Sequence, residues 1–311
     1  MGPATRMTTS EAIALATTHL RSLGGHVFDV LSITKPVSSA AAANLAKVVS
    51  KLSPILGNLI EFNAVEFLNG VDEFRRHGRW VRQDPGFPDT IFQGSIEPAP
   101  GFEIKAWFPL ATEITARFRD SQNHFEHDQT YVALIAWLPQ NLIYGKPSII
   151  EVCVVSAKSV AIARDAHYYN PPDYLVLEPE DTSQRTSNLQ QTNTNGYKWQ
   201  GTPEQFQRAS RIVQKWGKAG ARYNPTREYQ VRLRQLIARF PYRLDTNFAK
   251  MDRIVHPEIE VFKTRVLSRQ VHGRTIGEWS QTLFRADDMQ LRGALSEQLG
   301  IADLDAQDIL E

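Results

Sequence analysis

Apolar residues recur at helical spacing through the first eighty residues of the chain. The first of these runs begins with Thr and Ser residues that can cap a helix, and it ends at the pair Gly24-Gly25. The third begins at Ser53-Pro54, a cap followed by proline at the first helical position. The pattern predicts three helices, over residues 8–23, 38–52 and 53–74.

After Pro85 the pattern changes to short apolar or alternating runs between turn residues, which is typical of β-strands. Two of these runs are almost continuously apolar, as expected of strands that are covered on both faces. The expected strands are residues 89–96, 101–108, 130–138, 148–156 and 173–179, and residues 157–169 fit a crossover helix.

A polar segment rich in Ser, Thr, Asn and Gln occupies residues 180–201, and helical patterns return after it. The expected helices are residues 202–220, 226–240, 275–284 and 287–300. This order of helices, strands and helices predicts one mixed α/β domain over residues 1–311. Within it we expect a helical N-terminal part (about 1–80), an α/β core (81–180), and a polar loop followed by basic helices (181–311).

The composition is that of a globular protein, with 42% hydrophobic, 22% charged and 10% aromatic residues. The single cysteine, Cys153, excludes an intramolecular disulfide and fits a reducing cytoplasm. Because it lies in an apolar run, we expect it to be a core residue rather than a nucleophile. The longest apolar stretch, YVALIAWL, is far shorter than the ~20 residues that span a bilayer, so we expect no membrane segment.

Charge is distributed unevenly along the chain. Residues 204–250 contain eleven Lys or Arg residues against three acidic ones, a net charge of +8, whereas the whole chain carries +1. The remaining residues therefore carry −7. A basic block on a nearly neutral protein points to a polyanionic partner such as nucleic acid, although a solvated helix face is the alternative.

Glu103 and Lys105 stand one residue apart on an otherwise apolar predicted strand. Side chains i and i+2 share a face of a strand, so this pair lies together while Phe102 and Ile104 turn towards the core. Asp89 opens the preceding strand and can approach Glu103 if the two strands are neighbours. Two adjacent carboxylates repel unless a cation lies between them, and oxygen ligands favour Mg²⁺. The alternative is a solvent-facing ion pair on an edge strand.

The motif Pro88-Asp89, thirteen intervening residues and then Glu103-x-Lys105 resembles the signature of the PD-(D/E)xK nuclease superfamily. This superfamily includes most type II restriction endonucleases. The upstream run LGNLIEFNAVEFL is similar to a helix of MutH-like mismatch-repair nickases and their restriction-enzyme relatives. The resemblance covers roughly residues 50–180. It implies a restriction-endonuclease-like α/β fold, in which helices flank a mixed β-sheet, with helical N- and C-terminal additions.

The resemblance also implies a role for each site residue. Asp89 and Glu103 would ligate Mg²⁺ and position the scissile phosphate. Lys105 would hold the attacking water or help to deprotonate it, and Glu61 would support the metal site or ligate a second metal ion. The reaction would be in-line attack of water on a phosphodiester, leaving 5′-phosphate and 3′-hydroxyl ends.

The residues expected to bind DNA fall into two groups. The polar segment could read bases in a groove, because Asn and Gln pair with adenine and Arg pairs with guanine. Its candidates are Arg185, Asn188, Gln190, Gln191, Asn193 and Asn195. The basic helices are expected to contact phosphates, through Lys215, Lys218, Arg222, Arg232 and Arg234. The alternative for the polar segment is a disordered surface loop.

These inferences predict a Mg²⁺-dependent, site-specific endonuclease of double-stranded DNA, of the type II restriction kind. Cleavage of both strands at a symmetric site calls for a two-fold homodimer. The alternatives are a monomeric nicking or repair endonuclease, a catalytically silent DNA-binding protein of the same fold, and an RNA-binding protein that uses the basic helices. A zinc site in the run HFEHD, residues 124–128, is a weaker alternative, because such alternation is more often a polar loop.

Overall fold

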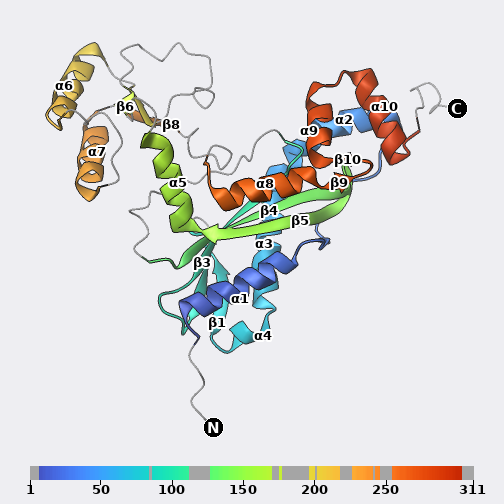
Figure 1. Ribbon diagram of the computed structural model, residues 1–311, viewed down its shortest axis with the longest axis horizontal. Helices are drawn as coiled ribbons and strands as arrows, with labels where there is room; N and C mark the ends of the chain where they lie inside the picture. The colour runs from blue at the N-terminus through green and yellow to red at the C-terminus, as the bar shows by residue number, and fades with distance from the viewer. Residues whose placement is uncertain are drawn as a thin grey trace, which may run out of the picture. The chain divides into compact units, whose positions relative to one another are not determined.

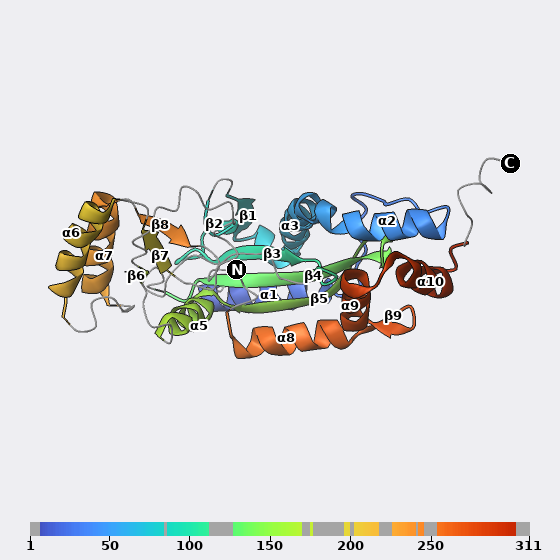
Figure 2. The same ribbon diagram turned by 90° about the horizontal axis from the view of Figure 1, so that it is seen from above.

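The computed structural model describes most of the chain, and its helices and strands are labelled in Figures 1 and 2. The described residues are 7–83, 86–111, 127–169, 175–176, 196–199, 202–217, 226–240, 242–245 and 254–302. The chain divides into two compact units that are not consecutive in sequence. The first unit comprises Met1–Ile114, Gln129–Ser156 and Pro257–Glu311, and the second comprises Thr115–Asp128 and Ala157–His256.

The first unit is built on a five-stranded mixed sheet in which the strands follow one another in chain order. The strands are β1 (Gly78–Arg82), β2 (Thr90–Gly94), β3 (Gly101–Trp107), β4 (Thr130–Asn141) and β5 (Tyr144–Ser156). Neighbouring strands are antiparallel except for β3 and β4, which are parallel. A parallel connection needs a long crossover, and residues 108–129 supply it in sequence. The mixed α/β class predicted from the sequence is therefore confirmed.

Helices flank this sheet. They are α1 (Thr9–Ser22), α2 (Ser39–Val49), α3 (Ser53–Asn69), α4 (Asp72–Arg75), α8 (Pro257–Ser268), α9 (Ile276–Arg285) and α10 (Asp288–Leu299), with a 3₁₀ turn, η1, at Ser50–Leu52 and a short hairpin of β9 (Gln270–Val271) and β10 (Arg274–Thr275). Figure 2 shows α3 on one side of the sheet and α8 on the other. Among the described helices, none combines the length and the apolar character needed to cross a membrane.

An aromatic cluster fills the space between the sheet and the helices α3 and α4. The Trp80 ring on β1 lies 5.2 Å from Phe92 on β2, 5.3 Å from Phe102 on β3 and 5.5 Å from Phe74 on α4, all between ring centroids. These four side chains are at most 1% exposed. Because Phe102 is committed to this cluster, strand alternation turns the next residue, Glu103, to the opposite face of β3.

Several helix and strand boundaries differ from the sequence expectations. The chain up to about residue 80 was expected to be a helical part, but residues 78–82 form the strand β1. Ser53 was expected to cap the third helix; it is instead the first residue of α3, which continues directly from the 3₁₀ turn and has Leu52 as its N-cap without a side-chain hydrogen bond. That helix ends at Asn69 rather than at Phe74, because the chain turns at Gly70 into the short helix α4.

The prediction for the first helix is confirmed. Thr8 caps α1 and forms a capping box with Glu11. The helix α8 was not foreseen. Its residues Ile259, Phe262 and Val266 are fully buried.

The second unit contains the helices α5 (Ala157–Tyr169), α6 (Pro203–Gln214) and α7 (Arg227–Arg239), and a three-stranded sheet. The strands of this sheet are β6 (Leu175–Val176), β7 (Gly196–Trp199) and β8 (Tyr242–Asp245). Thr202 begins α6 with a capping box and a proline follows it, so the two basic helices expected from the sequence are confirmed.

Candidate functional site

The site predicted from the sequence lies where β2 and β3 separate. The register pairs Ile91 with Gly101 and Thr90 with Phe102, and β2 begins at Thr90. Asp89 directly precedes β2. Its carboxylate Oδ2 accepts a hydrogen bond from the Ile104 N–H of β3 at 2.7 Å, where a backbone carbonyl of a paired strand would otherwise accept it. The side chain of Asp89 is therefore fixed by the β3 backbone and not only by its own loop.

Glu103 and Lys105 lie on the same face of β3 and both contact Asp89. The Asp89 N–H donates to Glu103 Oε2 at 3.1 Å, and the Lys105 ammonium donates to Asp89 Oδ2 at 3.3 Å. Lys105 also forms an ion pair with Glu103 Oε1. One ammonium group therefore lies between two carboxylates, at the position where their oxygens converge. We call Asp89, Glu103 and Lys105 the carboxylate–lysine cluster.

Burial shapes the electrostatics of this cluster. The side chain of Glu103 is 10% exposed and that of Lys105 is 20% exposed. Burial raises the pKa of Glu103 to about 7, and the neighbouring Asp89 charge adds to this rise while Lys105 opposes it. Burial alone acts to lower the pKa of Lys105, but the two carboxylates outweigh it and hold that pKa above its ordinary value. The lysine is therefore charged at neutral pH, and Glu103 is close to its titration point.

Glu61 reaches the neighbourhood of the cluster from α3, and its carboxylate is held by an arginine. Arg82, at the end of β1, donates to Glu61 Oε1 from Nη2 at 2.8 Å and from Nε at 3.2 Å. Burial raises the pKa of Glu61 and the charge of Asp89 adds to the rise, while Arg82 opposes both. Arg82 was not singled out from the sequence, because no strand was predicted over residues 78–82.

The structure brings together the three principal residues predicted from the sequence and places Glu61 near them. One alternative for Glu103 and Lys105 was a solvent-facing pair on an edge strand. That alternative is wrong, because β3 is the third of five strands and Glu103 is only 7% exposed. Among the described residues, no three His, Cys, Asp or Glu side chains already converge as a group that could hold a metal ion. The carboxylates face Lys105 and Arg82 instead.

The expected DNA-binding residues are only partly described. Lys215 caps the C-terminal end of α6, and Arg232 and Arg234 lie on α7, all three exposed. On α7 the exposed arginines alternate with the buried Leu233 and Leu236, so the basic face is the solvent face of an amphipathic helix. The other candidates lie outside the described residues: Arg185, Asn188, Gln190, Gln191, Asn193, Asn195, Lys218 and Arg222. The same is true of His124 and Glu126 in the weaker zinc alternative.

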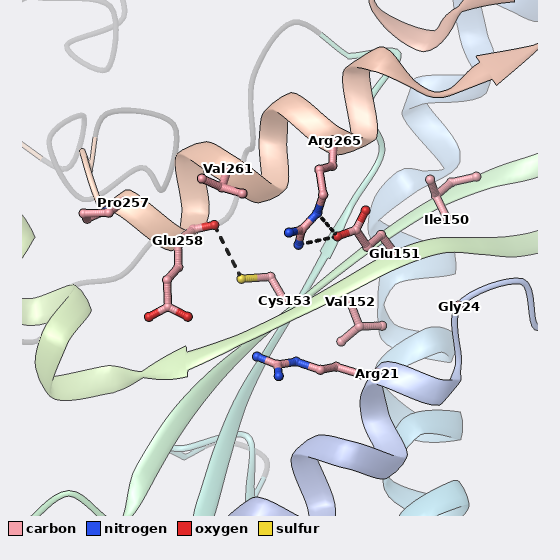
Figure 3. A pocket seen from close by; sticks show the side chains of 10 residues that line it. All are labelled: Arg21, Gly24, Ile150, Glu151, Val152, Cys153, Pro257, Glu258, Val261 and Arg265. Atoms are coloured by element: carbon pink, nitrogen blue, oxygen red, sulfur yellow. Dashed lines mark hydrogen bonds and ion pairs between the residues drawn. The ribbon is translucent and has the colours of Figure 1, made fainter.

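A cavity of about 550 Å³ lies elsewhere in the first unit, between α1, β5 and α8 (Figure 3). Two of the charged side chains that line the cavity neutralise each other, because Arg265 forms an ion pair with Glu151 at 2.5 Å. Cys153 also lines it, but burial raises the pKa of this thiol to about 11, so it stays protonated at neutral pH. Cys153 is a buried core residue, as the sequence predicted. The cavity therefore offers no activated nucleophile, and we place the candidate site at the carboxylate–lysine cluster.

These observations define a mixed α/β protein with a buried cluster of two carboxylates and a lysine at the point where two strands separate. Comparison of the chain with protein-family models, with curated proteins and with solved structures finds no match. The functional argument therefore depends on the geometry and the charge of the cluster.

Proposed function

We propose that the protein is a Mg²⁺-dependent, site-specific endonuclease of double-stranded DNA, with a restriction-endonuclease-like fold of the PD-(D/E)xK kind. The observation that carries this proposal is the convergence of Asp89, Glu103 and Lys105 at one point. In the sequence these residues match a short motif; in the folded chain they share hydrogen bonds and ion pairs although fourteen positions separate Asp89 from Glu103.

The residues of the cluster fit a divalent metal ion. Two carboxylates converge on the Lys105 ammonium, and oxygen ligands of this kind suit Mg²⁺. Burial is the main cause of the raised pKa of Glu103 and the Asp89 charge adds to it, so a further cation beside these carboxylates would favour the ionised form of Glu103. When bound, a divalent ion would stabilise charge on the phosphate and lower the pKa of the attacking water.

Each residue of the carboxylate–lysine cluster then has a specific role. Asp89 and Glu103 would ligate the ion and so position the scissile phosphate. Asp89 is preorganised for this task by the Ile104 N–H, so its oxygens need not be ordered during the reaction. The Lys105 ammonium would hold the attacking water and offset negative charge on the phosphate.

DNA binding is assigned to the basic helices, where Lys215, Arg232 and Arg234 contact phosphates. Reading of bases is assigned to the polar segment, within residues 183–199. A two-fold homodimer would bring one cluster to each DNA strand. The single cysteine, Cys153, is buried and forms no disulfide, which fits a reducing cytoplasm.

The test is to incubate the purified protein with plasmid and phage DNA in Mg²⁺ and in EDTA. We expect discrete fragments in Mg²⁺ alone, and we expect Asp89→Ala to abolish cleavage while leaving the DNA gel shift in Ca²⁺ intact. Nicked plasmid without linear product would favour the nicking or repair endonuclease. Intact DNA with a gel shift in Ca²⁺ would instead favour the catalytically silent DNA-binding protein, and normal cleavage by Asp89→Ala would remove the proposed site.

A further inference from the structure

The ion pair between Arg82 and Glu61 is the second charged contact beside the carboxylate–lysine cluster. Two nitrogens of the guanidinium, Nε and Nη2, donate to the same oxygen, Glu61 Oε1. The Arg82 side chain is 32% exposed and that of Glu61 is 16% exposed. A partly buried arginine with two donors on one carboxylate oxygen holds that oxygen in place more firmly than an exposed, single-contact pair does.

The backbone connects this pair directly to Asp89. Arg82 pairs with Thr90 in the β1–β2 register, and Thr90 is the residue that follows Asp89. The Gln83 N–H donates to the Asp89 carbonyl oxygen at 2.8 Å. The chain at Arg82 and Gln83 therefore also fixes the backbone of Asp89, the residue whose side chain contacts Lys105.

The effect of Arg82 on metal binding follows from the net charge of the side chains around the metal position. Asp89, Glu103 and Glu61 supply three negative charges, and Lys105 and Arg82 supply two positive ones, which leaves −1 when all are ionised. A divalent ion changes this total to +1, which a phosphodiester neutralises. Without Arg82, the charge of the remaining side chains before the ion binds would be −2 instead of −1. Glu61 would then have no guanidinium to hold it and could turn towards the ion.

We propose that Arg82 is a positioning residue that keeps the Glu61 carboxylate beside the metal position but off the metal, so that Asp89 and Glu103 alone ligate the ion. This inference rests on the proposed function. It assigns to Arg82 control over both the strength of metal binding and the geometry of catalysis. It acts through Glu61, not through substrate.

The first test is metal binding without DNA, with Mn²⁺ as the probe in isothermal titration. We expect Arg82→Gln to bind Mn²⁺ about fivefold more tightly than the wild type, because one positive charge near the ion is lost. The same variant should cleave at least tenfold more slowly, because Glu61 then competes for the ion. Tighter metal binding with slower cleavage is not a result that simple damage to the fold produces, since damage weakens both.

Three further variants test whether the change in Mn²⁺ binding depends on the charge of Arg82 and on Glu61. Arg79→Gln, at an exposed arginine on the same strand, is the matched control and should leave both measurements unchanged. Arg82→Lys keeps the charge and should bind Mn²⁺ within about twofold of the wild type. The double variant Glu61→Gln/Arg82→Gln removes one charge of each sign, so its Mn²⁺ affinity should return to that of the wild type.

The outcomes separate this inference from the proposed function. A wild-type protein that binds no Mn²⁺ and cleaves no DNA overturns both. A wild type that binds Mn²⁺, with Arg82→Gln equal to Arg79→Gln or weaker in Mn²⁺ binding, overturns the role of Arg82 alone. If the double variant keeps the tighter binding of Arg82→Gln, Arg82 does not act through Glu61 and the inference also fails. Should Arg82→Gln not fold, Arg82→Lys and Glu61→Gln decide. Glu61→Gln is expected to weaken Mn²⁺ binding by at most about fivefold, the effect of one lost charge, and a larger loss would make Glu61 a ligand.

Discussion

Among single residues, Glu103 has the property on which the candidate site most depends. It is a carboxylic acid on an interior strand, it is 7% exposed, and its pKa stands at about 7 chiefly because of burial. Its ionised form is therefore less favourable in the folded chain than in water, despite the ion pair with Lys105. A residue that costs stability when ionised is typical of a functional site rather than of a structural ion pair.

This property predicts how stability depends on pH in the metal-free protein. Because the folded-state pKa of Glu103 is raised, its contribution to stability is present below the ordinary value of 4.5 and is lost as the pH rises through 7. Glu103→Gln keeps the shape and removes the titration. In EDTA at pH 8 we expect its free energy of unfolding to exceed that of the wild type by about 3 kcal/mol.

At pH 5 the difference between Glu103→Gln and the wild type should be much smaller. Denaturant unfolding of both proteins at the two pH values measures it. A variant that is equally destabilised at both pH values would mean that the attraction to Lys105 outweighs burial, contrary to this account.

The role of Lys105 can be separated from DNA binding. We expect Lys105→Ala to lower the cleavage rate by about 10²–10⁴-fold, because the group that holds the water and offsets charge is lost. The dissociation constant for cognate DNA in Ca²⁺ and the sequence that is cut should not change. Lys51→Ala, at an exposed lysine of the same unit, is the matched control. A changed cleavage sequence would contradict the assigned role.

At the scale of elements, α8 is the helix that completes the first unit from a distant part of the sequence. Its buried residues Ile259, Phe262 and Val266 are spaced by three and four positions, so they form one face of the helix. The Phe262 ring lies 5.7 Å from the ring of Trp107 at the end of β3. The strand that carries the carboxylate–lysine cluster is therefore packed against a helix 155 positions further along the chain.

Packing of α8 should be essential for the stability of the first unit. Phe262 is fully buried, and we expect Phe262→Ala to lower the free energy of unfolding by about 3–5 kcal/mol. Val261, the neighbouring residue on the same helix, is 52% exposed, and Val261→Ala should change the stability by at most about 0.5 kcal/mol. Thermal unfolding of the two variants tests this difference, and equal melting temperatures would exclude α8 from the core.

At the scale of the whole molecule, the candidate site and the basic helices belong to different compact units. The carboxylate–lysine cluster lies in the first unit, and the basic helices α6 and α7 lie in the second. Cleavage and DNA binding should therefore respond independently to mutation.

Replacing Lys215, Arg232 and Arg234 together by Gln should weaken DNA binding for all sequences alike. If each residue contacts a phosphate, the slope of log affinity against log salt should fall by about 2–3. The matched control replaces three exposed basic residues of the first unit, Lys51, Arg76 and Arg285, and should leave this slope nearly unchanged. Titrations by fluorescence anisotropy at several salt concentrations measure both, and an equal loss in the two triple variants would contradict the assignment.

Local patterns in the sequence were sufficient for several features. Strand alternation predicted that Glu103 and Lys105 share a face while Phe102 faces the core, and the structure confirms both. Apolar runs predicted β4 and β5, and capping residues predicted the start of α1. These features depend on neighbours within a few positions, so the sequence of each segment contains the information.

Other features depended on contacts between distant segments. The run GRWVR is too short to show its period, and it becomes a strand because Trp80 packs against Phe92 and Phe102. The partnership of Arg82 with Glu61 and the interior position of β3 require the order of the strands, which no local pattern contains. The pKa of Glu103 likewise depends on burial by the assembled sheet and helices. The sequence alone therefore determined which residues could form the site, and the tertiary structure decided how they are charged, held and paired, because desolvation and ion pairing exist only once the segments pack together.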